Sequence, residues 1–392
     1  MRHRGPDDEG VFLDATVGLA HARLSILDRT EAGRQPMSTP LTHLVVNGEI
    51  YNHRELANQF GITDSLRSRS DSEVLLRLIE GIGMEKTLAS IDGMYAFAAY
   101  EPEQHRLHLV RDPFGVKPLF VMRHHDRIWF ASELKALMAV PDFTPRASSL
   151  ALHHYLSLDY IPGSLTAFDG IEEVRPGAWW TIDTLTGTIS QRAHAQTDWM
   201  TDESVSLEDA VGEARRLLRC AVRRQLVADV DVGIMLSGGL DSSSIAAMAV
   251  DAAGSSNFHT FSIGFADSSF NESHHGAAVA RKLGTNHHTI DVRPEDVPTT
   301  LPLVVAAIDE PYGDGSALPT YLLAQHAKAY VTVLLSGEGG DEMFSGYDTH
   351  AAAVARKRYR MIPQWIRRSL VGPLVNRLPV RHNKLSFDFK AK

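Results

Sequence analysis

Cysteine is almost absent from this sequence of 392 residues, which contains only Cys220. A single cysteine cannot form an internal disulfide, so a reducing compartment such as the cytoplasm is the expected location. Long hydrophobic runs are also missing. The longest, such as LPLVVAAI at 301–308, are far shorter than the ~20 residues that a membrane span needs. Because the formal net charge is −9, a general nucleic-acid binder is not expected either.

Two regions of the chain follow different hydrophobic patterns. Residues 1 to about 140 alternate short strand-like runs with turns, interrupted by a helical pattern at 72–83 whose apolar positions are 74, 75, 78 and 79. A segment with Pro and Gly follows, including 160–177, and then a polar stretch near 194–206. From residue 207 a helical pattern leads into strands that alternate with helices, at 232–236, 258–265, 287–292 and 330–337. This alternation predicts a parallel sheet with its ligand at the carboxyl ends of the strands. A domain boundary is expected between 195 and 207.

The stretch SGGLDSSS, Ser237 to Ser244, joins one of these apolar strands directly to a helix. Two glycines allow the backbone to approach an anion, and the free amides at the helix start point toward it. The hydroxyls add donors, and Asp241 can hold a divalent cation against phosphates. No lysine follows the glycines, so the loop suits pyrophosphate as leaving group, and the reaction indicated is adenylation.

A second loop, SGEGGDEMFSGY at 336–347, also follows an apolar strand. It offers three acids, Glu338, Asp341 and Glu342. Acidic loops at adjacent strand ends can share the Mg²⁺ of one nucleotide. We therefore expect the two loops to belong to one ATP site.

The chain resembles the glutamine-hydrolysing asparagine synthetases. SGGLDSSS resembles the pyrophosphate loop of the ATP-pyrophosphatase domain, and four further motifs match that family in order: NGEIYNHREL (47–56), SDSEVLL (70–76), DGMYAFAAYE (92–101) and RDPFGVKPLF (111–120). The resemblance covers residue 2 to at least residue 347. It implies an α+β N-terminal-nucleophile domain with four αββα layers over 1–195, the class II glutamine amidotransferase-like domain. An α/β ATP-pyrophosphatase domain with a parallel sheet follows over 207–392.

The resemblance further implies that the C-terminal domain activates aspartate with MgATP. β-Aspartyl-AMP and pyrophosphate form, and ammonia then produces asparagine. Glu338 is expected to assist formation of the acyl-adenylate, and Asp241 and Asp341 to hold magnesium. The expected ATP-binding residues are Leu236, Ser237, Gly238, Gly239, Asp241, Ser242, Ser243, Ile263, Ser336 and Gly337.

For the N-terminal domain the resemblance implies a glutaminase. Arg23 is expected to hold the α-carboxylate of glutamine as a forked ion pair, and Asp71 to meet the α-amino group. The Asn47 side chain and the Gly48 amide suit an oxyanion hole. The full set of expected glutamine-binding residues is Arg23, Leu24, Ser25, Ile26, Leu27, Asn47, Gly48, Glu49 and Asp71.

The nucleophile of that family is a cysteine exposed as the first residue after removal of Met. Here the His-Arg-Gly-Pro-Asp loop occupies residues 3–7 and position 2 is Arg2. Cys220 lies beside the apolar stripe of a predicted helix and is expected to be an inert thiol. We therefore expect a fragment truncated at both ends, which does not hydrolyse glutamine as it stands.

Two other readings remain open. The same ATP chemistry serves an asparagine-synthetase-like amidotransferase that acts on another carboxylate, or a synthetase that uses ammonia only. A non-catalytic remnant that binds glutamine and ATP belongs to a different class, and pyrophosphate release with ATP, Mg²⁺ and aspartate separates it from the enzymes. The expected partners are small molecules, namely glutamine or ammonia, aspartate and ATP, and a homodimer is common in the family.

Overall fold

The computed structural model describes residues 1–195, 200–254, 257–267 and 271–376. By its internal contacts the chain divides into two compact units, Met1–Asp231 with Pro298–Leu318, and Val232–Val297 with Pro319–Lys392. Helix α6 (Leu207–Gln225) falls in the first unit. The boundary expected between 195 and 207 stays a prediction. In the part of the chain that is described, no helix has both the length and the apolar character to cross a membrane.

Strands of the first unit form three sheets. The order in the largest is β11-β10-β6-β5-β4-β3, and the others are β1-β2 and β8-β7-β9. All of their pairings are antiparallel. The strands are β1 (Asp8–Leu13), β2 (Gly18–Arg23), β3 (Met37–Ser38), β4 (His43–Ile50), β5 (Gly93–Glu101), β6 (Arg106–Arg111), β7 (Phe120–His124), β8 (Arg127–Ala131), β9 (Ile171–Glu173), β10 (Ala178–Asp183) and β11 (Ile189–Ala193).

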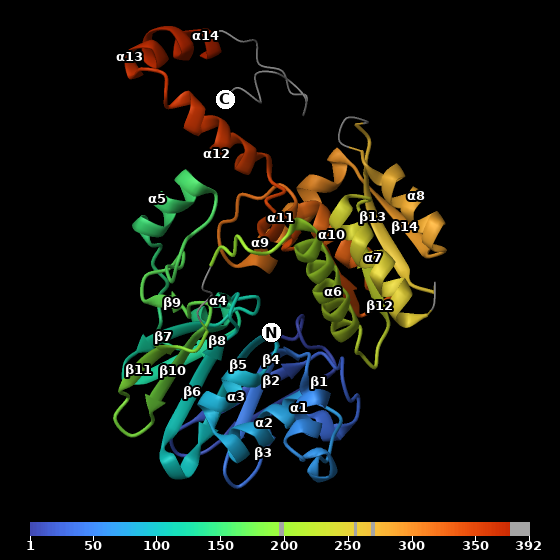
Figure 1. Ribbon diagram of the computed structural model, residues 1–392. Coiled ribbons are helices and arrows are strands. Elements are labelled where there is room, and N and C mark those ends of the chain that lie inside the picture. The colour runs from blue at the N-terminus through green and yellow to red at the C-terminus, as the bar shows by residue number, and fades with distance from the viewer. Residues whose placement is uncertain (196–199, 255–256, 268–270, 377–392) are drawn as a thin grey trace. The chain divides into compact units, whose positions relative to one another are not determined.

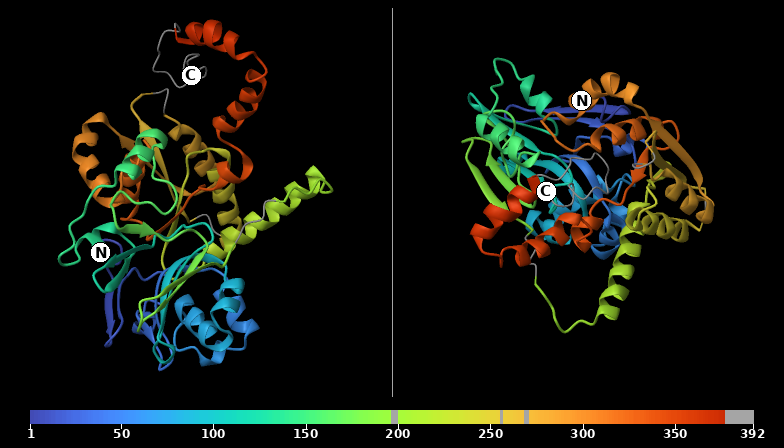
Figure 2. Two further views of the ribbon diagram at one scale, coloured as in Figure 1. Left: turned by 90° about the vertical axis from the view of Figure 1, so that its left-hand side faces the viewer. Right: turned by 90° about the horizontal axis from the view of Figure 1, so that it is seen from above.

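Helices α1 (His53–Gln59), α2 (Asp71–Ile82) and α3 (Met84–Ser90) lie together on one face of the large sheet (Figure 1; Figure 2, left). The other helices of this unit are α4 (Leu134–Met138), α5 (Ser149–Leu158), α6, and most of α9 (Val297–Ile308). Short 3₁₀ turns lie at Glu31–Gly33, Thr63–Ser65 and Pro102–Gln104.

The sequence of β5 explains why the large sheet is central. Alternate side chains point to opposite faces of a strand. Tyr95, Phe97 and Ala99 join the apolar cluster under α2 and α3, while Ala96, Ala98 and Tyr100 join a second cluster with residues of β2 and β7. A third cluster packs α4 on β7. The layers are therefore helix, sheet, sheet, helix, and the predicted αββα class is confirmed.

Helix α2 forms where the apolar spacing predicted it. Its N-cap is Ser70, whose hydroxyl accepts a hydrogen bond from the backbone N–H of Ser72, and acids occupy its first turn. The apolar positions Val74, Leu75, Leu78 and Ile79 are all buried. Capping and packing together place the first residue of the helix, Asp71, beside β4.

The second unit contains a parallel sheet in the order β14-β13-β12-β15, as the alternation of strands and helices predicted. Its elements are β12 (Val232–Met235), α7 (Leu240–Ala253), β13 (His259–Phe265), α8 (Ser273–Leu283), β14 (Asn286–Val292), most of α10 (Ala317–Ala327), β15 (Val333–Leu335), α11 (Gly340–Phe344), α12 (Asp348–Tyr359), α13 (Gln364–Ile366) and α14 (Gly372–Asn376). A 3₁₀ turn lies at Pro294–Asp296 and a π turn at Arg367–Val371.

The order of this sheet positions its loops. Strands β12 and β15 are neighbours, with Val232 paired to Val333, and α7 and α11 begin shortly after their carboxyl ends (Figure 1). The loops before these helices therefore lie at one edge of the sheet. Leu323 and Ala327 of α10 pack on Phe261 and form the apolar cluster of this unit.

Candidate functional sites

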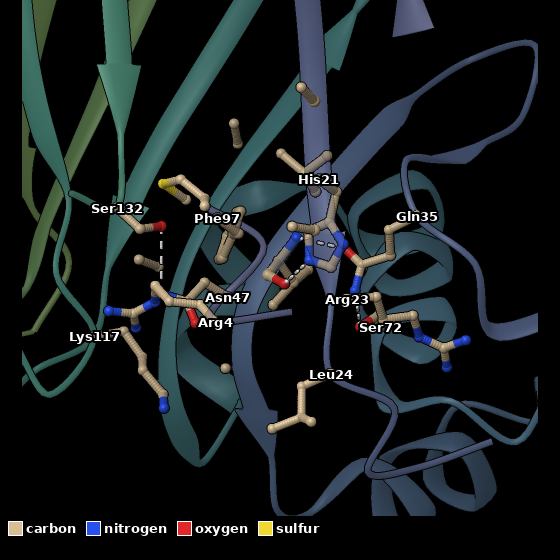
Figure 3. Close-up of a pocket in the computed structure, with 18 of the residues that line it drawn as sticks. Arg4, His21, Arg23, Leu24, Gln35, Asn47, Ser72, Phe97, Lys117 and Ser132 are labelled. Carbon is tan, nitrogen blue, oxygen red and sulfur yellow. Dashed lines mark hydrogen bonds between the residues drawn. The ribbon is translucent and has the colours of Figure 1, made fainter. Parts of the chain in front are cut away.

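A pocket of about 810 Å³ lies within the first unit (Figure 3). Such a volume suits a small molecule. All but one of the residues predicted to bind glutamine line it, the exception being Ser25. The residues that the sequence analysis missed include Arg4, His21, Gln35, Lys117 and Ser132. Arg4 and Lys117 belong to motifs that the sequence does display, HRGPD and RDPFGVKPLF.

The strand pair β4–β5 supplies the floor of the pocket around Asn47 and Gly48. A Cβ atom at Gly48 would lie 2.1 Å from the carbonyl oxygen of Met94, so only glycine fits this close approach. The Asn47 amide donates to the Ser132 hydroxyl at 3.4 Å. The Gly48 backbone carries no side chain, and the neighbouring Asn47 amide is fixed by its hydrogen bond. These two features are compatible with the oxyanion hole predicted for Asn47 and Gly48.

Arg23 is buried, and most of its donors are already used. Its guanidinium donates to three carbonyl oxygens, those of Leu27 (3.0 Å), Asp28 (2.6 Å) and Thr30 (3.2 Å). An arginine has five N–H donors, so two remain for a ligand. Arg23 therefore lines the pocket, and its hydrogen bonds also stabilise the 27–30 loop.

Asp71 and Glu49 differ in how their charges are satisfied. The Asp71 carboxylate accepts from the backbone N–H groups of Ile50 (2.7 Å) and Ser72 (2.8 Å), whereas Glu49 has no hydrogen bond or ion pair with any described residue. Burial, and then the charge of Asp71, raise the pKa of Glu49 well above its usual range. Burial also raises the pKa of Asp71, against the effect of its hydrogen bonds. Of this pair Glu49 is therefore the group that holds a proton more readily.

His21 joins the pocket to α2 through a chain of hydrogen bonds (Figure 3). Its Nε2–H donates to the Val46 carbonyl at 3.0 Å, the Val46 N–H donates to Gln35 at 2.6 Å, and the Gln35 amide donates to Ser72 at 3.3 Å. Because a carbonyl only accepts, Nε2 carries a hydrogen, and in the neutral ring Nδ1 then carries a lone pair. That Nδ1 is buried and has no partner among the described residues. Burial also lowers the pKa of His21, which favours the neutral ring.

The second unit contains the loop predicted to bind pyrophosphate. Gly238 has a φ of +89°, and a Cβ atom there would lie 2.5 Å from the Gly276 nitrogen, so both backbone conformation and the closeness of α8 require glycine. The Ser237 and Ser242 hydroxyls are 2.9 Å apart, and the hydroxyl of Ser243 is buried without a partner among the described residues. The loop is therefore held in one conformation and keeps a free hydroxyl.

The acidic loop contacts this first loop, as predicted. A Cβ atom at Gly340 would lie 2.6 Å from Asp241 Cγ, and one at Gly337 would lie 3.1 Å from Asp241 Cβ. Glu338 is exposed on the same loop. Leu236 is fully buried, and Ile263 packs on the apolar cluster of β13 and α10. Backbone and polar groups, more than these apolar side chains, are what this edge offers to a ligand.

The oxygen ligands at this edge fit Mg²⁺ in a nucleotide complex. Among the described residues no group of three or more His, Cys, Asp or Glu could hold a metal ion by itself. Mg²⁺ is commonly bound by one or two carboxylates together with substrate phosphates and water. Asp241 and Asp341 are carboxylates on the two loops, so the predicted pair fits such a site if a nucleotide supplies the remaining ligands.

Comparison with known proteins assigns a family to each part of the chain. Residues 1–193 match the glutamine amidotransferase domain family, and residues 213–387 match the asparagine synthase family. A putative glutamine-hydrolysing asparagine synthetase 2 of Methanocaldococcus jannaschii is 32% identical over 408 residues, covering 97% of this chain and 76% of that protein. The chain belongs to the glutamine-hydrolysing asparagine synthetase family. The resemblance inferred from the motifs is confirmed.

Bacterial members of the asparagine synthetase family are similar over less of their own length. Asparagine synthetase 1 of Bacillus subtilis is 35% identical over 376 residues, covering 94% of this chain and 58% of that protein. Asparagine synthetase B of Escherichia coli is 34% identical over 369 residues, covering 88% and 60%. This chain spans about three fifths of these two relatives.

Proposed function

We propose that the second unit activates the side-chain carboxylate of aspartate with ATP. In the proposed reaction β-aspartyl-AMP and pyrophosphate form, and ammonia then produces asparagine. The observation that carries this proposal is the contact between the two loops, where Gly340 approaches the Asp241 carboxyl group. Family membership supports it, because the relatives are named asparagine synthetases.

The residues of this edge suit the separation of pyrophosphate from AMP. ATP supplies an AMP group, which leaves an acyl carbon far more readily than a carboxylate oxygen does. Backbone amides at the start of α7, together with the Ser243 hydroxyl, are donors for the departing pyrophosphate. Asp241 and Asp341 would hold Mg²⁺, which neutralises charge on the phosphates. Glu338 is the proposed acid–base group for the acyl-adenylate step.

We propose that the first unit binds an amino acid of the glutamine type in its pocket. Arg23 retains donors for an α-carboxylate, and Glu49 and Asp71 offer acceptors for an ammonium group. Asn47 and Gly48 provide the donors for a side-chain carbonyl. The proposed location is the cytoplasm, since a lone cysteine needs no oxidising compartment. A homodimer is proposed by analogy with the family, and sedimentation would test it.

The deciding experiment is pyrophosphate release from the 392-residue chain mixed with ATP, Mg²⁺ and aspartate. We expect release that depends on aspartate, and aspartyl hydroxamate when hydroxylamine is present. Asp241→Asn should abolish both. Asp251→Asn, at the exposed far end of the same helix, should leave both unchanged.

Three results would change the proposal. Release with another carboxylic acid and none with aspartate would move the acceptor to that acid. The similarity to a protein named amidase chyE from Penicillium rubens, 30% identical over 380 residues, makes a panel of acids worth including. ATP binding without any pyrophosphate release would favour the alternative of a non-catalytic protein that binds ATP and glutamine. Release that survives Asp241→Asn would exclude the role given to this edge.

A further inference from the structure

Two loops carry most of the residues predicted to bind glutamine, and one buried acid joins them. The 23–30 loop begins with Arg23 and the 67–71 loop ends with Asp71, and residues of both line the pocket. The Asp28 carboxylate is buried and accepts from the backbone N–H groups of Thr30 (3.1 Å) and Arg69 (2.7 Å). The shape of one loop therefore depends on the position of the other.

The backbone at Asp28 needs contacts from outside the loop. Its φ is +50°, a left-handed conformation that residues other than glycine seldom adopt. Such a conformation persists where the surrounding structure holds it in place. On the pocket side the Arg23 guanidinium donates to the Asp28 carbonyl at 2.6 Å. The Asp28 backbone N–H donates to the carboxylate of Asp229 at 2.9 Å.

Asp229 comes from a distant part of the sequence, the segment between α6 and β12. Its backbone N–H donates to the Ile26 carbonyl at 2.9 Å, so it makes a second hydrogen bond to the 23–30 loop. Its carboxylate also lies 3.4 Å from the Arg69 guanidinium of the 67–71 loop. Asp229 thus contacts both loops, although it is not among the residues that line the pocket.

The segment that carries Asp229 is itself fixed to the first unit. At the end of α6 the Arg224 guanidinium pairs with Glu55 and with Asp92, each at 2.8 Å. The Asp229 carboxylate is therefore presented to the two loops from an anchored backbone.

The contacts of the Asp229 carboxylate differ in strength. The Arg69 side chain is 77% exposed, and an ion pair in such a position contributes little. The hydrogen bond from the Asp28 N–H matters more, because that group belongs to a buried residue and a carboxylate is a strong acceptor. The essential property of Asp229 is accordingly an acceptor oxygen, more than its charge.

We propose that Asp229 is a positioning residue for the pocket, and that its carboxylate holds the 23–30 loop in the conformation that binds the amino acid. This inference rests on the proposed binding of a glutamine-type amino acid in the first unit. Asp229 acts through Asp28 and Ile26 without touching the ligand. When its carboxylate is removed, the Asp28 N–H loses its acceptor and the loop no longer holds Arg23 in its place.

The test is isothermal titration of the 392-residue chain with L-glutamine. Asp229→Ala should lower the affinity about tenfold, which corresponds to about 1.4 kcal/mol. Asp229→Asn keeps an acceptor oxygen for the Asp28 N–H and should stay within twofold of the unchanged chain. Asp231→Ala, which changes an exposed acid of the same segment, is the matched control and should also stay within twofold.

Hydrogen exchange followed by mass spectrometry gives a second readout that needs no ligand. In Asp229→Ala the amides of residues 24–30 should exchange faster than in the unchanged chain, whereas those of residues 74–79 in α2 should not. Asp229→Asn should restore slow exchange in the 23–30 loop.

Four results would overturn the inference. The first is an Asp229→Ala variant that binds glutamine as tightly as the unchanged chain does. The second is an Asp229→Asn variant as weak as Asp229→Ala, because the charge would then be essential. The third is faster exchange throughout the first unit of Asp229→Ala, which would indicate a general loss of stability. The fourth, no binding of glutamine by the unchanged chain, would also reject the proposed function of the pocket, which the first three results leave standing.

Discussion

Glu49 and Asp71 line one pocket, yet they take up protons differently. Asp71 is the first residue of α2 and accepts two backbone hydrogen bonds, which stabilise its charge. Glu49 has no such bonds to described residues, and burial is the main cause of its raised pKa. At the scale of single residues, then, local hydrogen-bond donors decide which of the two carboxyl groups ionises more readily.

A pH dependence of stability follows from the raised pKa of Glu49. In the window between its usual range and its raised value, the folded state binds more protons than the unfolded state. Stability is therefore greatest below this window and falls as the pH rises through it. Glu49→Gln removes the effect, so the variant should be more stable than the unchanged chain at pH 8, with little difference at pH 4.5.

Urea unfolding followed by tryptophan fluorescence at several pH values measures this difference. Glu85→Gln, an exposed glutamate of α3, is the matched control and should show no such dependence. A Glu49→Gln variant that is less stable than the unchanged chain at pH 8 would mean that the charged carboxylate is stabilised in the fold. The nearby Lys117 would be the source of that stabilisation.

At the scale of elements, the important contact is between the loops that precede α7 and α11. The hydrogen-bonded pairing of β12 with β15 places these loops side by side, and Gly340 approaches the Asp241 carboxyl group so closely that a Cβ atom would overlap it. The contact is possible because Gly340 of the acidic loop has no side chain, which leaves room for the Asp241 carboxyl group of the other loop. Neither loop shows this when considered alone.

Gly340→Ala should disturb this contact without unfolding the unit. The added methyl group must displace either Asp241 or the acidic loop, and a shift of about 1 Å near reacting groups costs roughly 10²-fold in rate. We expect pyrophosphate release to fall by about that factor while the thermal midpoint changes little. Gly315→Ala, where a Cβ atom meets nothing within 4 Å, is the control. Unchanged release by Gly340→Ala would separate this contact from the chemistry.

At the scale of the whole molecule, the two units differ in the groups that they offer for chemistry. The only cysteine, Cys220, lies partly buried in α6 and is not among the residues that line the pocket. The pocket of this chain therefore contains no thiol nucleophile for an amide. The reaction proposed for the second unit needs no such group.

Ammonium should therefore support amide formation by the 392-residue chain, and glutamine should not. Mass spectrometry of ¹⁵N-labelled product, made with either ¹⁵N-ammonium or amide-¹⁵N-glutamine, distinguishes the two nitrogen sources. Cys220→Ser should behave like the unchanged chain. Label transferred from glutamine, or glutamate formed above the uncatalysed background, would show that another group acts as nucleophile.

Local sequence patterns were enough to predict the main helices and strands and to identify the family. The apolar spacing of 72–83 predicted α2, and the alternation of strands and helices after residue 207 predicted a parallel sheet, because helices and strands expose side chains with different periods along the chain. The loops at 237–244 and 336–347 each follow a strand of the predicted parallel sheet. Because parallel strands end at the same edge of a sheet, the sequence predicted that the two loops lie together.

Pairing between distant groups was decided by the tertiary structure alone. No local pattern reveals that Arg23 donates three hydrogen bonds to carbonyls of the 27–30 loop. Nor does one reveal that, among the described residues, the Lys117 side chain makes no hydrogen bond or ion pair while Arg4 pairs with Glu133. A charge is free or satisfied according to which groups folding brings within about 4 Å. The sequence by itself thus determined the elements, the layers and the family, whereas packing in three dimensions decided which polar groups remain available to a ligand.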